Sequence, residues 1–412
     1  MEDRRELRRR LSRLERSRRS GGALPEKGPQ TLQEELGAEV TTASGPAYRL
    51  ENRFPADHPH GSGKLADLMD FDASLAAEVA RQPALGEVPL ERLAFLDTET
   101  TGLAGGAGTL VFLVGIGTFS EGVFRLHQYF LRDPAQEAGM LEALQEDLEA
   151  ISGFVTFNGQ AFDVPLLEMR YQIGLRRRWS LGDLPHLDLL HPSRRLWRRA
   201  LPDCTLSTLE RQMLGVTRTG EDVPSALIPA LYLDYLHTGD TRGMSRVIYH
   251  NSVDILSLVG LAAQVLHRHR QTDLARLSGP EALAVARWHE SAGRWQPADQ
   301  AFRVALEAVT DPAARVEALR RYTTHLKRHE HWGEAIPGWQ TWHGLEASDP
   351  EPCLELAKYY EWHRKDLAEA WHWAEAALVC LSHWPPGWRR DEAWSSIQHR
   401  LERLARKRAG GG

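Results

Sequence analysis

Cysteine is scarce in this chain, whose 412 residues include only Cys204, Cys353 and Cys380, far apart and with no CxxC spacing. That spacing argues against a disulfide framework and against a structural zinc site. Long apolar runs are also missing, since none approaches the roughly 20 residues that a membrane-spanning helix needs. The first segment contains arginine but no apolar stretch, which argues against a secretion signal or an anchor. We therefore expect a cytoplasmic protein without a membrane partner.

The overall charge gives little sign of nucleic-acid binding, because the formal net charge is −6. Charge is uneven along the chain, however, and residues 1–20 contain nine arginines and four acidic residues. This basic arm could bind phosphates, or it could be a solvated helix with pairs such as Glu6 and Arg10. The same two interpretations apply to the clusters Arg176–Arg178 and Arg194, Arg195, Arg198 and Arg199.

The length predicts two or three domains, since one domain usually takes roughly 100 to 200 residues. Residues 21–46 are rich in Gly, Pro, Ser and Thr, so we expect a flexible linker there. Residues 47–270 contain three strand-like runs, "RLAFLDT", "TLVFLVGIGTF" and "GVFRLHQYFL", and then a helix-like segment before "GFVTFN". Short breaks predict antiparallel neighbours and the helix predicts a crossover, which together indicate a mixed α/β domain.

From about Gly279 onward the strand pattern ends, and Ala, Leu, Trp, Glu and Arg recur at helical spacing. Residues 279–408 contain three similar segments, each with a large residue followed three positions later by alanine: Trp295/Ala298, Trp332/Ala335 and Leu367/Ala370. The steps of 37 and 35 residues, with two helices in each unit, resemble tetratricopeptide repeats. We expect an all-α repeat domain whose concave face could bind a protein partner.

The segment "FLDTETTG" places Asp97 and Glu99 at the end of a strand-like run. Residues i and i+2 of a strand point to the same face, so the two carboxylates should project together. An acidic pair in this position could also simply cap the turn after the strand. The choice between the two depends on what other acidic residues the chain supplies.

Two more acidic residues occur in similar surroundings. Asp163 follows a strand-like run and the turn Asn158–Gly159, at the start of a helix, and Asp254 lies inside a strongly apolar helix, where it needs a partner. Carboxylates at a strand end and on two helices suit the hard cations Mg²⁺ and Mn²⁺. Two such ions about 3.5–4 Å apart can activate water and stabilise the leaving oxygen in phosphodiester hydrolysis.

The segments "FLDTETTG", "FNGQAFD" and "YHNSVD" resemble, in this order, the three motifs of the DEDD superfamily of 3′–5′ exonucleases, which have a ribonuclease H-like fold. The longer runs "HLDLLHPSRRLW", "TLSTLERQMLG", "VPSALIPALYLDYLHTGD" and "HNSVDILSL" more narrowly resemble the YprB-type ribonuclease H-like proteins. This similarity covers roughly residues 47–270, and the helical tail agrees with it. It implies a ribonuclease H-like mixed sheet flanked by helices, followed by the tetratricopeptide-like region.

The resemblance implies metal ligands at Asp97, Glu99, Asp163 and Asp254. It also implies contact of Asp97 with both ions, and a residue that acts on the attacking water, either Tyr four or His five positions before the last Asp. Here the two are exchanged, with His250 four positions before Asp254 and Tyr249 five before. On a helix, positions i and i+4 share a face, whereas i and i+5 differ by about 140°. Because an ordinary histidine has a pKa of about 6.5, His250 could be the general base; Tyr249 remains the alternative.

Other polar residues of these segments are candidates for substrate binding. Thr98 and Thr100 could offer hydroxyl or N–H groups to the terminal nucleotide, and Asn158 could touch the substrate or hold its turn. The glycines of "GLAGGAGTL" match neither GxxxxGK[ST] nor GxGxxG, which argues against nucleotide binding there. We expect Gly105 and Gly106 to form a loop that admits the 3′ end to the metals.

The first hypothesis is therefore a divalent-metal-dependent 3′–5′ exonuclease, or a related nuclease, that acts on a single-stranded end of DNA or RNA with two Mg²⁺ or Mn²⁺ ions. The alternative is a weakly active or inactive nuclease fold that serves as a nucleic-acid-binding scaffold and recruits protein partners through its helical repeats. The exchanged third motif favours this alternative. No recognition module in the sequence separates DNA from RNA.

Overall fold

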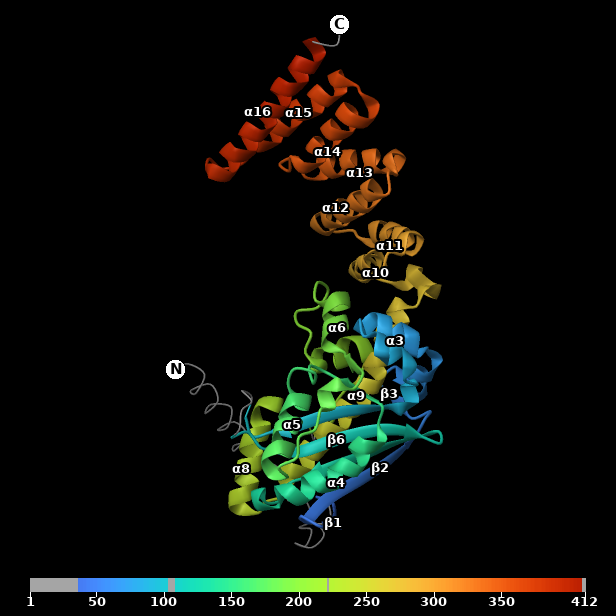
Figure 1. The fold of residues 1–412 in the computed structure, drawn as a ribbon, viewed down its shortest axis with the longest axis vertical. Coiled ribbons are helices and arrows are strands. Elements are labelled where there is room, and N and C mark those ends of the chain that lie inside the picture. Colours follow the sequence, from blue (N-terminus) through green and yellow to red (C-terminus); the bar gives the residue numbers. More distant parts are fainter. Residues whose placement is uncertain (1–35, 103–107, 221, 410–412) are drawn as a thin grey trace. The chain divides into compact units, whose positions relative to one another are not determined.

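The computed structural model describes residues 36–102, 108–220 and 222–409 (Figure 1). The chain divides into two compact units that are discontinuous in sequence. Unit 1 comprises residues 1–69, 88–187 and 215–260, and unit 2 comprises residues 70–87, 188–214 and 261–412. The predicted division near residues 270–279 differs from this one, because two segments of the predicted nuclease domain pack with the helical tail. The predicted basic arm, residues 1–20, lies outside the described residues.

A mixed sheet forms the centre of unit 1, in the strand order β1-β2-β7-β6-β5-β8-β9. Its strands are β1 (Ala38–Thr42), β2 (Gly45–Pro55), β5 (Leu93–Thr100), β6 (Val111–Ser120), β7 (Val123–Phe130), β8 (Gly153–Thr156) and β9 (His186–Asp188). A separate hairpin pairs β3 (Pro59–His60) with β4 (Gly63–Lys64). β5, β6 and β7 pair antiparallel, whereas β5 and β8 pair parallel. The short breaks and the helix crossover of the sequence predict this arrangement, and the mixed α/β fold class is confirmed.

Helices cover both faces of the sheet. They are α4 (Glu137–Ala150), α5 (Asp163–Gly174), α8 (Ile228–Thr238) and α9 (Arg242–His269), of which α9 continues into unit 2 beyond Gly260. Consecutive strand residues point to opposite faces. Gln128 accordingly donates to the Ile248 carbonyl of α9 at 2.8 Å, and Tyr129 donates to Asp147 of α4 at 2.8 Å. α9 and α4 therefore lie on opposite faces, and α5 lies beside α4 (Figure 1).

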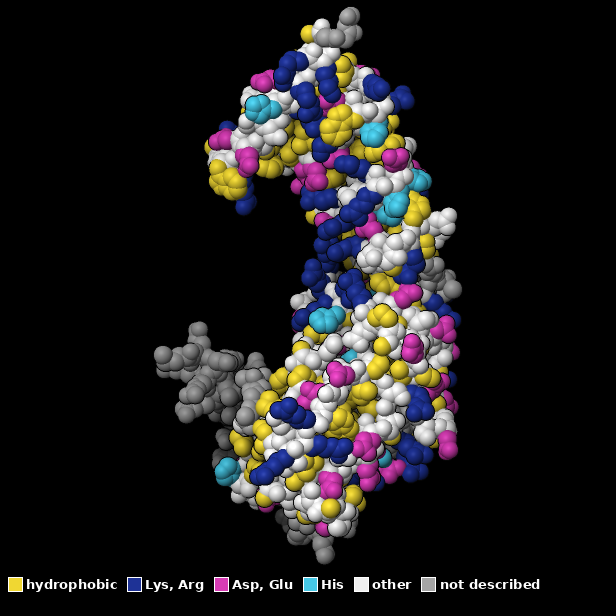
Figure 2. Space-filling model, in the orientation of Figure 1, with side chains coloured by type: hydrophobic (Ala, Val, Ile, Leu, Met, Phe, Trp, Pro, Cys, Tyr) yellow, Lys and Arg dark blue, Asp and Glu magenta, His cyan; other side chains and the backbone are white. Residues whose placement is uncertain are grey.

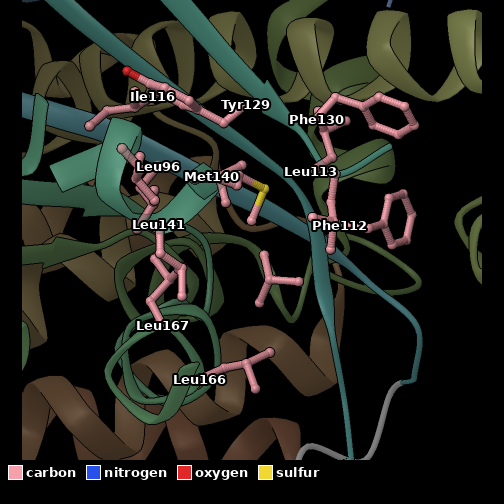
Figure 3. Close-up of a cluster of buried hydrophobic side chains, with 14 of the residues drawn as sticks. Leu96, Phe112, Leu113, Ile116, Tyr129, Phe130, Met140, Leu141, Leu166 and Leu167 are labelled. Carbon is pink, nitrogen blue, oxygen red and sulfur yellow. The ribbon is translucent and has the colours of Figure 1, made fainter. Parts of the chain in front are cut away.

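The core of unit 1 lies between the sheet and these helices (Figure 3). Leu96 of β5 is buried in the same cluster as Met140 and Leu141 of α4 and Leu167 of α5. At another part of the cluster, the rings of Phe112 and Tyr232 stack with centroids 4.0 Å apart. Burial of this apolar surface stabilises the sheet end at which the acidic residues lie, by roughly 25 cal/mol per Å² removed from water.

The predicted linker, residues 21–46, is only partly described, and its described part is folded. β1 pairs antiparallel with β2 over Ala38–Thr42, with Gly45 at the turn in a conformation of φ 125°. That φ is in the region that favours glycine. Residues 38–46 of the predicted linker therefore form an edge hairpin, in which Ala43 and Ser44 are the turn and Gly45 and Pro46 are already paired with β1.

Unit 2 is helical in its described residues. The segments inserted in the predicted nuclease domain form α3 (Ala73–Ala80), α6 (Leu190–Trp197) and α7 (Leu206–Leu209). The tail forms α10 (Gly279–Ser291), α11 (Trp295–Ala308), α12 (Pro312–Arg328), α13 (Trp332–Leu345), α14 (Glu351–Tyr359), α15 (Leu367–Ser382) and α16 (Trp388–Ala409). The all-helical region that the sequence predicts is confirmed.

The helices of the tail pack as the consecutive pairs α10–α11, α12–α13 and α14–α15. The second helix of each pair begins at the large residue of the sequence repeat, Trp295, Trp332 or Leu367. The alanines three positions later, Ala298, Ala335 and Ala370, have no exposed surface. A small residue at this position lets the two helices of a pair approach closely. Within the described part of the chain, the helices are too short or too polar to cross a membrane.

Candidate active site

Two carboxylates leave the same face of the central strand β5. Asp97 and Glu99 pair across the sheet with Gly115 and Leu113 of β6, and the register shifts between Glu99 and Thr100. The strand therefore ends its regular pairing directly after Glu99. Both side chains lie beside this irregularity in strand pairing. An irregularity of this kind commonly changes the direction in which the side chains of a functional site point.

Two helices bring further acidic residues to this end of the sheet. Asp163 is the first residue of α5, where the positive end of the helix dipole favours a carboxylate. On α9, the Nε2 atom of His250 lies 3.4 Å from Asp254 Oδ2 and 3.9 Å from Glu99 Oε1. The ligand atoms of Glu99, His250 and Asp254 all lie within 4.8 Å of one another. The five catalytic candidates of the sequence thus come from β5, α5 and α9 of unit 1.

The electrostatics of this group favour a bound cation. Burial, and then the charges of Asp254, Glu99 and Asp163, raise the pKa of Asp97 well above its usual range. Burial, and then Asp254 and Asp163, likewise raise the pKa of Glu99, although Arg218 opposes that change. Carboxylates that repel one another in a poorly solvated place are stabilised in the ionised form by a positive charge. Carboxylate oxygens with one imidazole nitrogen form a donor set that a divalent metal ion can use.

Sequence reasoning missed the arginine of this site. Arg218 donates through Nη2 to Asp254 Oδ1, and its Nη1 lies 3.3 Å from Asp222 Oδ1. It comes from the irregular segment before α8, which has no periodicity that would mark it. Its guanidinium neutralises part of the negative charge, and it shares Asp254 with any metal ion that binds there.

Asp222 was also missed, and it determines how His250 is oriented. The Nδ1 atom of His250 lies 2.7 Å from Asp222 Oδ1 and 2.9 Å from Arg218 Nη1. We assign the ring proton to Nδ1, because Asp222 can only accept, while Arg218 has Asp222 and Asp254 as acceptors for its own N–H groups. The lone pair is then on Nε2, the nitrogen that faces Glu99 and Asp254. A carboxylate, an imidazole and an Nε2 lone pair in this order form the arrangement of an oriented general base, and the Ser225 hydroxyl lies 3.3 Å from the same Nε2.

A neutral network holds Asp97 in place. Gln128 donates to Asn251 Oδ1 at 2.8 Å, so the amide nitrogen of Asn251 faces Asp97 and donates to its Oδ2, also at 2.8 Å. Asn251 is completely buried, and it fits only because residue 115 is glycine. A Cβ atom on Gly115 would lie 2.3 Å from Asn251 Oδ1. Neither Asn251 nor Gly115 stood out in the sequence, although Asn251 directly follows His250.

The Gly115→Ala variant should therefore lose activity without unfolding. The added methyl group displaces Asn251, which releases Asp97, and loss of such an orienting contact typically costs about 10–100-fold. The measurement is the rate of the divalent-dependent cleavage that the sequence motifs predict, together with a thermal melt. Gly333→Ala is the matched control, since a Cβ there meets no atom within 4 Å. Because both changes act through one contact, Gly115→Ala and Asn251→Ala should not be additive; full additivity would contradict this network.

The remaining predicted residues make local contacts. Thr98 donates to Asp163 Oδ1 at 2.5 Å, and Thr100 donates to the Gly102 carbonyl at 2.8 Å. Asn158 has φ 69°, a left-handed conformation typical of a turn, and its carbonyl accepts from Ala161. The hydroxyl of Tyr249 accepts from the Thr219 N–H at 3.3 Å. Thr98 thus positions one of the acidic residues, and substrate contacts of Thr98, Thr100 and Asn158 stay predictions.

Two other expectations concern glycine and cysteine. Gly105 and Gly106 lie outside the described residues. Cys353, Cys380 and His343 place their sulfur and nitrogen atoms within 4.8 Å of one another in unit 2. The wide spacing of the cysteines in the sequence therefore does not exclude a metal-binding geometry. The packing of α13, α14 and α15 brings together residues that are distant in the chain.

The antiparallel strands, the parallel neighbour β8 and the acidic end of β5 define a ribonuclease H-like protein. A model of the RNase H superfamily matches residues 94–266, a range that contains all five catalytic candidates. Over 369 residues the chain is also 30% identical to the uncharacterized protein YprB of Bacillus subtilis (strain 168), covering 87% of this chain and 85% of YprB. The chain belongs to the YprB family within this superfamily, and the relationship includes the helical tail.

Proposed function

We propose that this protein is a metal-dependent 3′–5′ exonuclease that hydrolyses phosphodiester bonds at a single-stranded end of DNA or RNA. The observation that carries the proposal is the proximity of Asp97, Glu99, Asp163 and Asp254, whose charges act on one another, beside a histidine in contact with Asp222. The superfamily relationship supports hydrolysis of nucleic acid. The 3′–5′ direction is supported by the order of the three acidic motifs in the sequence.

The four carboxylates would hold Mg²⁺ or Mn²⁺ ions, and His250 would act on the attacking water. When bound, two divalent ions activate the water and stabilise the leaving oxygen. The Nε2 lone pair of His250 takes the proton of this water as its oxygen bonds to phosphorus and the P–O3′ bond breaks. Asp222 stabilises the imidazolium that results, because its carboxylate accepts the Nδ1 proton at 2.7 Å. Arg218 places a positive charge beside the same carboxylates.

We also infer that the pairs α10–α11, α12–α13 and α14–α15 are tetratricopeptide-like units. The repeated starts at Trp295, Trp332 and Leu367 and the buried alanines support this inference. A protein partner on their concave face stays a prediction. Truncation at Gly279 would test it poorly, because the cut passes through unit 2 and exposes the surfaces that residues 70–87 and 188–214 cover.

A digestion series tests the proposed function. Single strands of DNA and RNA, labelled at either end, are incubated with the full chain in Mg²⁺, in Mn²⁺ or in EDTA. We expect divalent-dependent cleavage in which a 3′ label leaves at once as a mononucleotide, while a 5′ label passes through a ladder of shortening strands. A 5′ label released first would contradict the direction. Absence of divalent-dependent cleavage on every strand would contradict the enzyme and leave the scaffold alternative.

A further inference from the structure

An arginine-lined groove lies entirely within unit 2, separate from the acidic residues of unit 1. It has a volume of about 730 Å³ and is lined by eight arginines and one acidic residue, Glu290. Figure 2 shows Lys and Arg side chains gathered over the part of the molecule that contains α10 and α12. The volume lies within the roughly 300–1,000 Å³ of pockets that hold whole organic ligands, so the groove can take more than a single inorganic ion.

The helical spacing of these residues explains why they converge. Arg194 and Arg198 are four residues apart at the end of α6, so they share a face. Arg321 and Arg328 are seven apart on α12, which again places them on one face. Arg287 projects from α10 into the same groove. Cations from α6, α10 and α12, joined by Arg81 after α3, thus point into one concave surface.

Few of these charges are neutralised by the protein. Glu317 lies 3.3 Å from Arg199 and 3.2 Å from Arg321, and Glu290 lies 2.9 Å from Arg328. Four other arginines of the groove have no acidic side chain within ion-pair distance in the described part of the chain: Arg81, Arg194, Arg198 and Arg287.

The crowding of cations has an electrostatic cost. Partial burial, and then the positive charges of Arg321 and Arg199, lower the pKa of the Arg287 guanidinium. Burial, and then Arg81, lower the pKa of Arg195 to about 10. An anion in the groove would relieve this repulsion, and a concave wall of one charge sign concentrates the field that attracts it.

We propose that this groove binds the phosphate backbone of a single-stranded nucleic acid, as a binding surface additional to the acidic cluster. The choice of nucleic acid as the polyanion rests on the proposed function. Arginine is the residue type that fits it, because the guanidinium fork holds phosphate oxygens in pairs, and the lining residues include eight arginines and no lysine. Contacts of this kind position a strand without reading its sequence, so DNA and RNA should both bind.

The test compares the full chain with the triple variant Arg194→Gln/Arg198→Gln/Arg287→Gln. These three side chains are exposed and have no ion pair within the described structure, and their removal relieves cation repulsion, so their replacement should not lower the melting temperature. Binding of fluorescent DNA and RNA strands is measured in EDTA at several salt concentrations. We expect the affinity to fall at least about tenfold and the slope of log K against log salt to decrease by about 2, since each single-strand phosphate contact contributes about 0.7.

The matched control is Arg364→Gln/Arg389→Gln/Arg406→Gln, which removes the same charge from exposed positions of unit 2 outside the groove. Equal losses in both triple variants would mean that only overall charge matters and would overturn the proposal. Unchanged binding in the groove variant would also overturn it, and would favour an acidic protein surface as the occupant.

Failure of this proposal differs from failure of the nuclease. If the groove variant binds normally and the wild type digests strands, the groove proposal is contradicted and the nuclease proposal is supported. If the groove variant loses binding but no strand is cleaved by the wild type, the groove proposal is supported and the nuclease proposal is contradicted. If both proposals are supported, the groove variant should have a raised KM on long strands but normal cleavage of a dinucleotide, which has a single internucleotide phosphate and so offers the arginines little to bind.

Discussion

The Asp97→Asn variant is expected to lose divalent-dependent cleavage by at least about 10³-fold, equivalent to about 4 kcal/mol of transition-state stabilisation. Asp97 lies on the central strand, and its charge is coupled to those of Asp254, Glu99 and Asp163. An amide at this position keeps the size of the side chain but removes its negative charge. The measurement is the initial rate of release of labelled mononucleotide in saturating Mg²⁺ or Mn²⁺.

The same variant should be more stable than the wild type in EDTA at neutral pH. In the folded protein the pKa values of Asp97 and Glu99 are raised above their ordinary values. The folded state therefore binds more protons than the unfolded state between the ordinary and the raised pKa. The stabilisation by these groups is fully present below the ordinary carboxyl pKa and is lost as the pH rises through the raised values. Asp97→Asn should remove part of this loss of folding stability at neutral pH. In the wild type, bound Mg²⁺ should reduce the same loss.

The control for both measurements is Asp57→Asn, at an exposed carboxylate of unit 1. It should change neither the cleavage rate nor the pH dependence of the melting temperature in EDTA. An Asp97→Asn protein that melts normally and still cleaves at more than a tenth of the wild-type rate would contradict the assignment of Asp97 as a metal ligand.

The His250→Ala variant should lose about 10²–10⁴-fold in rate, the range that general bases usually contribute. Its Nε2 faces Glu99 and Asp254 while Asp222 holds the opposite ring nitrogen, and alanine removes both sets of contacts. A purely structural role for His250 would instead lower the melting temperature of the variant, which the rate measurement should therefore accompany.

Tyr249→Phe is the matched control for His250→Ala. The Tyr249 hydroxyl contacts the Thr219 N–H at 3.3 Å and lies on a different face of α9 from Asp254. Its removal should leave the rate within about twofold and the melting temperature unchanged. A large loss in Tyr249→Phe with a normal His250→Ala rate would reverse the two roles.

Local patterns in the sequence were sufficient to predict the strands and helices that carry the acidic residues. The apolar runs around Phe95, Val114 and Val155 predicted β5, β6 and β8, since strand periodicity depends on a few neighbouring residues. The spacing of His250 and Asp254 likewise predicted that they share a helical face, and their side chains lie 3.4 Å apart. The edge hairpin β1–β2 was missed because its turn residues also occur in linkers.

The residues that surround the acidic cluster could not be predicted in this way. Arg218 and Asp222 lie in an irregular segment, and only the packing of that segment against α9 brings them to His250. Asn251 reaches Asp97 only because Gly115, on a strand far away in sequence, leaves room for it. These contacts depend on how individual atoms pack in the tertiary structure, so the periodicity of the sequence does not predict them.

The sequence by itself determined the fold class and the helical tail and predicted the acidic residues of the candidate site, because each of these depends on residue type and short-range spacing. The tertiary structure alone decided that β1 and β2 belong to the sheet, that residues 70–87 and 188–214 pack with the tail, and which nitrogen of His250 faces the carboxylates. It also brought the arginines of α6, α10 and α12 into one groove. The physical reason is that charge and hydrogen-bond partners act through space, whereas sequence patterns report only on neighbours along the chain.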